Sequence, residues 1–396
     1  MVIDSFGIGA MPDARKFGDE GSNTYGNIID KTGIKLPNLI SLGLNNIEGV
    51  RNLNMPSGTV IEPFNSPQAA YARLSEKTFA KDTTAGHYEI AGLVLSKPFG
   101  IYKFFPHEIV AAIEQAAQIQ FIGNEIASGT EIIQRLGPEH LRTKCPILYT
   151  SQDSVMQIAA DVSVIPLRRL YEICEIAREI MVGDWAVGRI IARPFIHSAD
   201  GKFIRTEDRK DYALPPPGIT ILDKLTECGI NVTAVGKIND IFCGRGISQS
   251  FHTGNNNEGI RKTLQLIHTA DSGLIFVNLV DTDMLYGHRN DVNGYAEALC
   301  AFDDQLPEIL NGLRDDDILI ITADHGCDPT TVSTDHSREY VPLLIYGKKV
   351  APTDLGTIRG FDCIAEFIGA AFGIIKKSVI FNLLNEVQYY GKKNIQ

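Results

Sequence analysis

The stretch "ITADHGCDPTTVSTDH", from Ile321 to His336, joins the end of an apolar run to a polar segment rich in aspartate and histidine. The apolar run is "DILIITAD", which starts at Asp317, before the quoted stretch, and ends at Asp324. His325 follows directly. A second pair, Asp335–His336, follows in the next polar segment. The whole chain contains only nine histidines. Two Asp–His pairs at this place therefore indicate either ordinary polar loop residues or ligands of a metal ion.

Apolar, β-rich runs of this kind recur along the chain and alternate with segments of helical periodicity. The predicted strands are "MVID" from Met1, "CPILYT" from Cys145, "RIIARPF" from Arg189, "NVTAVGK" from Asn231, "GLIFVNLVD" from Gly273, "DILIITAD" from Asp317 and "VPLLIYG" from Val341. The predicted helices are "HEIVAAIEQAAQ", "LRRLYEICEIAREIM", "ITILDKLTEC", "NEGIRKTLQLIHTA", "YAEALCAFDDQLPEILNGL" and "CIAEFIGAAFG". Because several strands are apolar almost throughout, we expect an α/β fold with helices on both faces of a mostly parallel sheet.

Two segments interrupt this alternation. They are "SKPFGIYKFFP" at residues 96–106 and "ALPPPG" at residues 213–218. Three consecutive prolines continue neither a helix nor a central strand, so the second segment is interpreted as a linker. The prediction is a core domain of residues 1–97 and 214–396, with residues 98–213 inserted as a cap domain.

The composition excludes several classes of protein. Hydrophobic residues make up 44% of the 396 residues, which supports a large folded core. The net charge of −11 argues against nucleic acid or an anionic membrane as a partner. No apolar run is long enough to span a membrane, and the first residues do not form a signal peptide. The seven cysteines are never spaced as CxxC, so a reducing cytoplasm is expected. Cys145, Cys174 and Cys300 are interpreted as core thiols.

Acids and histidines follow several of the predicted strands. Asp4 ends the first strand, and "LVDTDMLYGH" places Asp283 and His288 after the strand that begins at Gly273. The carboxyl ends of parallel strands share one edge of a sheet, so these groups should converge with Asp324–His325 and with His336. Mixed carboxylate and imidazole ligands suit Mn²⁺, Zn²⁺ or Fe²⁺, and their number suggests two ions about 3.5–4 Å apart. A single acid at a strand end is more often a helix cap or a loop residue.

The segment "KDTTAGHYEIAG", from Lys81 to Gly92, offers a nucleophile. Thr83 and Thr84 precede a helix-like stretch, where a hydroxyl is commonly a helix cap. A hydroxyl at a helix N-terminus can also attack phosphorus, because backbone N–H groups bind phosphate oxygens and a metal lowers the hydroxyl pKa. The remaining histidines are interpreted as surface or core residues, with His87 as a possible exception: His87, His107, His140, His197, His252 and His268.

Eight longer motifs occur in one order along the chain: "DSFGIGAMPDARKFGDEGSNTYGNI", "KDTTAGHYEIAG", "ASGTEII", "YTSQDSVMQIAA", "VGRIIARPF", "AVGKINDIF", "NLVDTDMLYGHRND" and "ITADHGCDPTTVSTDHSREYVPLLIYG". In these motifs the chain resembles the bacterial phosphopentomutases, a family of the alkaline phosphatase superfamily. The resemblance extends from Asp4 to about Tyr346. It implies an alkaline-phosphatase-like α/β core with an inserted α/β cap.

The resemblance also implies a dinuclear manganese site and a covalent mechanism. Carried over by motif, one Mn²⁺ is held by Asp4, Thr83, Asp324 and His325, and the other by Asp283, His288 and His336. Thr83 would be the nucleophile, present as phosphothreonine in the active enzyme. The family interconverts ribose 1-phosphate and ribose 5-phosphate, and the 2-deoxyribose phosphates, through a pentose 1,5-bisphosphate. Glucose 1,6-bisphosphate or ribose 1,5-bisphosphate acts as activator, in the metabolism of nucleosides and pentose phosphates.

Contacts to the substrate follow from the same motifs. Ser151 and Asp153 in "YTSQDS" would face the sugar, while Arg189, Ile191 and Lys237 would frame the distal phosphate. Arginine and lysine suit phosphate by charge and by hydrogen-bond geometry. Taken alone, Arg189 and Lys237 are equally well interpreted as solvated surface charges. Asp153 could equally cap a helix that begins at "SVMQIAA".

The chain departs from the family pattern at a few positions. Only "MVI" precedes Asp4, where many members have a longer strand. Ala85 and Tyr88 replace a hydroxyl residue and a tryptophan near the nucleophile, and Asn27 and Asp161 stand where histidine is common. None of these changes removes an expected metal ligand.

Two other functions remain open from the sequence. One is a phosphatase or phosphodiesterase on the same metal-dependent core. A phosphoglycerate mutase would share this core, but it would be expected to have serine, not threonine, at the nucleophile position. The other is a binding protein for a metal or a phosphosugar without catalysis. The partners expected are small pentose phosphates, with no obligate protein partner evident.

Overall fold

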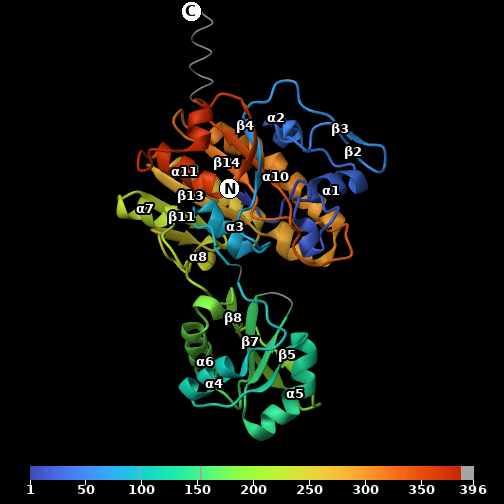
Figure 1. The fold of residues 1–396 in the computed structure, drawn as a ribbon, viewed down its shortest axis with the longest axis vertical. Coiled ribbons are helices and arrows are strands. Elements are labelled where there is room, and N and C mark those ends of the chain that lie inside the picture. Colours follow the sequence, from blue (N-terminus) through green and yellow to red (C-terminus); the bar gives the residue numbers. More distant parts are fainter. Residues whose placement is uncertain (98, 152–153, 385–396) are drawn as a thin grey trace, which may run out of the picture. The chain divides into compact units, whose positions relative to one another are not determined.

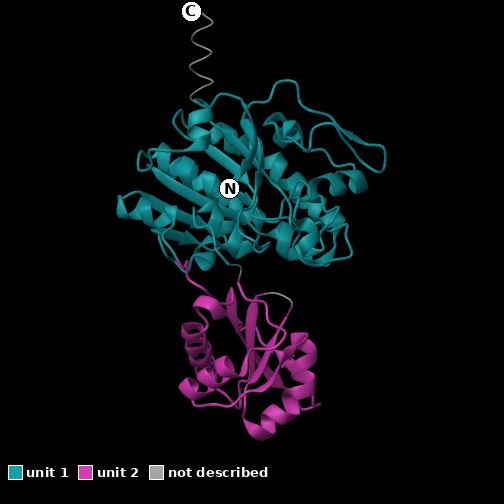
Figure 2. Ribbon diagram, viewed as in Figure 1, with its two compact units in different colours: residues 1–98, 218–396 teal, residues 99–217 magenta. Residues whose placement is uncertain are grey.

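The structure is a computed structural model, and it describes residues 1–97, 99–151 and 154–384. The chain forms two compact units, Met1–Pro98 together with Gly218–Gln396, and Phe99–Pro217 (Figure 2). The second unit is thus inserted into the first, and its interpretation as a cap stays a prediction. Within the described residues, no helix combines the length and the apolar character needed to cross a membrane.

An eight-stranded sheet forms the centre of the first unit (Figure 1). Its strands lie in the order β12 (Gln249–Phe251), β11 (Asn231–Val235), β13 (Gly273–Leu279), β1 (Val2–Ile3), β14 (Leu319–Thr322), β15 (Val341–Tyr346), β4 (Ala70–Ser75) and β16 (Asp354–Arg359). The first five of these are parallel to one another, whereas β15 is antiparallel to both β14 and β4, and β16 is parallel to β4. The sheet is therefore mixed and mostly parallel. A short ribbon, β2 (Leu53–Asn54) with β3 (Val60–Ile61), lies outside it.

Helices cover this sheet on both faces. Their bounds are α1 (Thr24–Thr32), α2 (Pro37–Ser41), α3 (Thr83–Ile90), α7 (Ile221–Glu227), α8 (Ile238–Ile241), α9 (Asn256–Thr269), α10 (Val292–Gly312) and α11 (Asp362–Ala371). α1, α9 and α10 pack together on one face, and α3, α7 and α11 pack together on the other. Strands enclosed in this way bury both sets of side chains, which explains why β1, β13 and β14 are apolar in sequence.

The second unit has its own sheet, in the order β10 (Lys210–Ala213), β8 (Arg189–His197), β7 (Val155–Asp161), β6 (Ile147–Thr150) and β5 (Ile122–Ile126), with β9 (Phe203–Arg205) paired to β8. Two helices, α4 (His107–Ala117) and α6 (Leu167–Ile180), share one apolar core with the sheet. A third helix, α5 (Gly129–Thr143), closes a second core that contains Phe195 and Phe203.

The seven predicted strands and six predicted helices are all present, within a few residues of the expected bounds. One alternative is wrong: "SVMQIAA" begins no helix, because Val155–Asp161 is strand β7, paired with both β6 and β8. Cross-strand pairing outweighs the local pattern there. The expectation of core thiols is met by Cys174, which is buried, but Cys145 and Cys300 are only partly buried.

Candidate metal centre

Three neighbouring parallel strands bring three aspartates to one edge of the sheet. Asp4 directly follows β1, and Asp324 lies two residues after β14. Asp283 follows β13 within a π-helical turn, Thr282–Tyr286, a local distortion that is frequent at functional sites. All three carboxylates are buried. The order β13-β1-β14 thus places acids that are distant in sequence beside one another.

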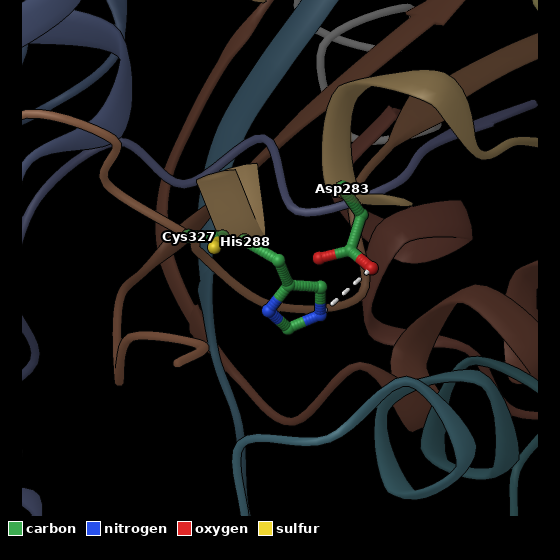
Figure 3. Close-up of side chains that lie close together, drawn as sticks. All are labelled: Asp283, His288 and Cys327. Carbon is green, nitrogen blue, oxygen red and sulfur yellow. Dashed lines mark ion pairs between the residues drawn. The ribbon is translucent and has the colours of Figure 1, made fainter. Parts of the chain in front are cut away.

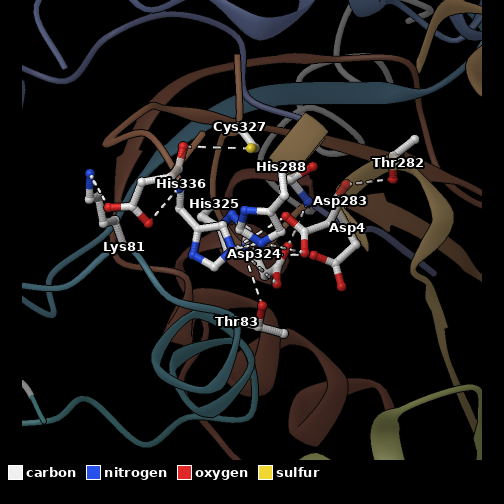
Figure 4. Close-up of polar contacts among 12 residues, drawn as sticks. Asp4, Lys81, Thr83, Thr282, Asp283, His288, Asp324, His325, Cys327 and His336 are labelled. Atoms are coloured by element: carbon white, nitrogen blue, oxygen red, sulfur yellow. Dashed lines mark hydrogen bonds and ion pairs between the residues drawn. The ribbon is translucent and has the colours of Figure 1, made fainter. Parts of the chain in front are cut away.

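The first group of side chains surrounds the imidazole of His325 (Figure 4). Its Nε2 lies 3.2 Å from Asp324 Oδ2 and 3.6 Å from Asp4 Oδ1. The same nitrogen lies 3.1 Å from Thr83 Oγ1. Two carboxylates, an imidazole and a hydroxyl therefore face one another within the reach of a single cation.

The second group surrounds Asp283. Its Oδ1 lies 3.3 Å from His336 Nε2, and its Oδ2 lies 3.4 Å from His288 Nε2 (Figure 3). The two Nε2 atoms are 3.1 Å apart. The groups adjoin, since the ring centroids of His325 and His336 are 3.9 Å apart. All seven residues that the resemblance assigns to metal binding consequently lie in one cluster.

Helix α3 presents Thr83 to this cluster. Asp82 is the N-cap of the helix, and its side chain accepts the Ala85 N–H at 3.0 Å. The alternative that Thr83 itself caps the helix is therefore wrong, and its hydroxyl is directed to His325 instead. Gly86 permits the close approach of α3, because a Cβ there would lie 2.2 Å from the Asp324 carbonyl oxygen.

The arrangement of the carboxylates fits divalent cations. Each of the three carboxylates has one buried oxygen that accepts no hydrogen bond from a described group: Asp4 Oδ1, Asp283 Oδ1 and Asp324 Oδ2. Such atoms are rare in folded proteins unless an ion or water satisfies them. Burial, together with the charges of Asp324 and Asp283, raises the pKa of Asp4 to about 7. Cations in this cluster would remove that repulsion.

The imidazoles of His288 and His336 face the Asp283 carboxylate and favour its charged form. Burial works against ionisation of Asp283, but His336 and His288 outweigh it, and the pKa of Asp283 falls well below its usual range. Conversely, the hydrogen bond to Asp283 raises the pKa of His288 to about 9. Metal ions would take the place of these protons, since only neutral imidazole binds a metal.

Two residues contact the candidate ligands although sequence analysis assigned neither of them a role; His87 was singled out there only as a possible exception among the histidines. His87 is fully buried, and its Nδ1 lies 2.8 Å from the Thr83 carbonyl oxygen and 3.2 Å from Asp324 Oδ2. Asn278 donates its Nδ2 to Asp4 Oδ2 at 2.8 Å. An amide inside the otherwise apolar run "LIFVNLV" was a signal that sequence reasoning could have used. Such partners fix the orientation of metal ligands.

Cys327 is a further candidate ligand that sequence reasoning missed. Its sulfur lies with Asp283 and His288 in a group of three possible ligand atoms (Figure 3). Burial raises the pKa of the Cys327 thiol. Metals bind the thiolate, so Cys327 is a weaker candidate than the imidazoles.

The structure places the expected substrate residues in both units. Lys237 is the N-cap of α8 in the first unit, and its charge is one of those that offset the rise in the Asp4 pKa caused by burial. Arg189 begins β8, is exposed, and lies 3.6 Å from Asp211. Ile191 is buried and Ser151 is partly buried. Asp153 lies outside the described residues.

The departures from the family pattern have local partners. Asn27 donates Nδ2 to Asp328 at 2.6 Å, and the buried Tyr88 donates its hydroxyl to the Ile241 carbonyl. Ala85 is buried without a polar group. In the second unit, Asp161 accepts from His197 Nδ1 at 2.7 Å and from Ser163. None of these four residues occupies a position of the metal cluster.

Comparison with known proteins identifies the class of protein to which this fold and cluster belong. A family profile described as the Metalloenzyme superfamily matches residues 1–383. Nearly the whole chain is thus of the metalloenzyme, or alkaline phosphatase, superfamily. The individual proteins that resemble this chain belong to one family within that superfamily. A phosphopentomutase of Caldanaerobacter subterraneus is 54% identical over 94% of this chain and 93% of its own length.

A phosphopentomutase of Acetivibrio thermocellus is also 54% identical, over 94% of this chain and 95% of its own length. The chain belongs to the phosphopentomutase family of enzymes. Among solved structures, a phosphoglycerate mutase of Leishmania mexicana is 12% identical over 95% of each chain, with a TM-score of 0.46.

Proposed function

We propose that this enzyme interconverts the 1-phosphates and 5-phosphates of ribose and 2-deoxyribose, through a phosphothreonine at Thr83 and a pentose 1,5-bisphosphate. The observation that carries the proposal is the position of Thr83. Its Oγ1 lies 3.1 Å from His325 Nε2, at the first residue of α3 and beside buried carboxylates. Identity of 54% to phosphopentomutases supports the same reaction.

Two divalent cations, proposed to be Mn²⁺, fit the cluster. One would be held by Asp4, Thr83, Asp324 and His325, and the other by Asp283, His288 and His336. When bound, such ions lower the pKa of a hydroxyl and offset the charge of a phosphoryl group. Two divalent cations bring four positive charges, and the three carboxylates cancel only three of them. The site therefore stays cationic within an acidic protein and favours phosphate.

Phosphoryl transfer balances over one cycle. In the first half, the phosphorus of phosphothreonine bonds to the free hydroxyl oxygen of a pentose monophosphate, its bond to Thr83 Oγ1 breaks, and the hydroxyl proton passes to Oγ1. In the second half, Oγ1 accepts the other phosphoryl group of the bisphosphate and returns the proton to the departing sugar oxygen. Glucose 1,6-bisphosphate or ribose 1,5-bisphosphate would phosphorylate Thr83 before the first cycle. The free N–H groups at the start of α3 favour a phosphate there.

The substrate contacts are proposed from charge and chemistry. Arg189 and Lys237 would bind the distal phosphate by charge-assisted hydrogen bonds, with Ile191 packing beside it. Ser151 and Asp153 would bind the sugar hydroxyls. The charge of Lys237 is among those that lower the pKa of Asp4 against the effect of burial, which supports a role at the same site.

The test uses Thr83→Ala, with Thr84→Ala as the matched control one residue along α3. Ribose 1-phosphate is supplied with Mn²⁺ and a catalytic amount of glucose 1,6-bisphosphate, and ribose 5-phosphate and inorganic phosphate are both measured. T83A should abolish turnover but keep a thermal shift with Mn²⁺, while T84A stays active. Full mutase activity in T83A would show that the covalent mechanism is wrong. Phosphate as the main product of the wild-type enzyme would identify a hydrolase instead.

A further inference from the structure

Two segments of the first unit meet at the candidate metal centre without belonging to a common sheet. One is the loop of residues 76–82, which leads from β4 to Thr83 at the start of α3. The other carries His336 and lies between β14 and β15. Because neither the loop nor His336 is part of a helix or strand, side chains that link the two segments decide how firmly Thr83 and His336 are held together.

Arg338 makes the first link. Its guanidinium is buried, and its Nη1 donates to the carbonyl oxygens of Thr78 at 2.7 Å and Ala80 at 2.5 Å, and to the Glu76 carboxylate. Its Nε and Nη2 donate to the two oxygens of the Asp13 carboxylate at 3.2 Å. Buried carbonyl groups need such donors, so one arginine fixes the course of the loop. Lysine cannot replace this fork, since its ammonium carries three hydrogens and the guanidinium carries five.

Lys81 makes the second link (Figure 4). Its Nζ lies 3.1 Å from Asp335 Oδ2 and 3.2 Å from both carboxylate oxygens of Asp19. The same Asp19 carboxylate accepts the Arg338 backbone N–H at 2.9 Å, so the two links form one network. The side chains of Lys81 and Asp335 are 18% and 41% exposed, and an ion pair so exposed contributes little to stability. Its loss is therefore separable from unfolding.

We propose that Arg338 and Lys81 are positioning residues of the reaction, which hold the loop before Thr83 at a fixed distance from His336. Arg338 follows His336 by two residues, and Lys81 precedes Thr83 by two. The role rests on the proposed function, in which Thr83 carries the phosphoryl group and His336 holds a cation. Since a misplacement of about 1 Å costs roughly 100-fold in rate, contacts so close to both residues act on kcat without touching the substrate.

The first experiment is a double-mutant cycle of Lys81→Met and Asp335→Asn in the full chain. Asparagine keeps an oxygen for the His336 N–H, which Asp335 Oδ1 accepts at 2.8 Å. Each single variant should lower kcat for ribose 1-phosphate by about tenfold and leave KM within about twofold. The double variant should lose no more than either single variant, because all three break the same link.

The second experiment replaces Arg338 by lysine, which keeps a positive charge beside Glu76. R338K should lower kcat by about 100-fold at a temperature where circular dichroism shows it to be fully folded. The matched control is Arg73→Lys in β4, whose side chain is 19% exposed and bonds Glu48 and Thr357. R73K removes a guanidinium that bonds no segment of the candidate metal centre, so it should keep kcat within about twofold.

Three outcomes overturn the proposal. A much larger loss in K81M than in D335N would show that Lys81 acts on the substrate and not through Asp335. R338K with kcat within about twofold of the wild type, once folded, would reduce Arg338 to a structural role. If R338K does not fold, wild-type kcat in both K81M and D335N overturns the proposal by itself.

Mass spectrometry of the protein after incubation with glucose 1,6-bisphosphate separates this role from the proposed function. The wild-type enzyme and the variants should all carry phosphate on Thr83. Variants that are phosphorylated and turn over at the wild-type rate would overturn the positioning role alone. A wild-type enzyme that turns over without phosphothreonine would overturn the proposed function, and the positioning role with it.

Discussion

Replacing Gly86 by alanine should move Thr83, the proposed nucleophile, away from the candidate metal centre. The new Cβ would lie 2.2 Å from the Asp324 carbonyl oxygen, whereas ordinary contact begins at 3.4 Å, so α3 or the Asp324 turn must shift by about 1.2 Å. Such a shift stretches the 3.1 Å approach of Thr83 to His325. Misplacement by about 1 Å costs roughly 100-fold in rate, or about 2.7 kcal/mol. The free energy of unfolding should fall by only about 0–2 kcal/mol, because alanine favours the helix.

The assay measures kcat for ribose 1-phosphate in the variant and in the wild-type enzyme. Thermal unfolding of both proteins is measured separately, with and without Mn²⁺. The matched control is Gly259→Ala, also in a helix and buried, where the new Cβ would lie 3.1 Å from the end of the Leu279 side chain and 3.7 Å from Thr253 Oγ1, with no backbone atom as close. G259A should keep kcat within about twofold. If G86A also kept kcat within about twofold, the close packing of α3 against Asp324 would not position Thr83, and the reasoning would be refuted.

Two further predictions concern the candidate metal ligands. His87→Ala removes the group 3.2 Å from Asp324 Oδ2, so the affinity for Mn²⁺ should fall by about 10- to 100-fold in calorimetric titration; an unchanged affinity would contradict the supporting role. Chelation by EDTA should abolish mutase activity and lower the thermal midpoint, and added Mn²⁺ should restore both, whereas persistent activity in EDTA would argue against a metal centre.

The strands that carry the aspartates were predictable because they are enclosed on both faces. Enclosure makes β13 and β14 continuous apolar runs, and an acid at the end of such a run stands out. β4 and β16 were missed, since their mixed residues acquire strand structure only by pairing with each other and with β15. The same holds for β7, whose sequence also fits a helix.

The α/β class follows from residue type and local periodicity in the sequence, and the resemblance to a known family supplied the complete set of candidate ligands, including Thr83. Only the tertiary structure decided which strands are neighbours, and hence that β1 lies between β13 and β14. It also decided that His87 and Asn278 support the ligands, and that Gly86 allows α3 to touch the Asp324 turn. These contacts join residues up to hundreds of positions apart, and their energies depend on packing that no local pattern contains.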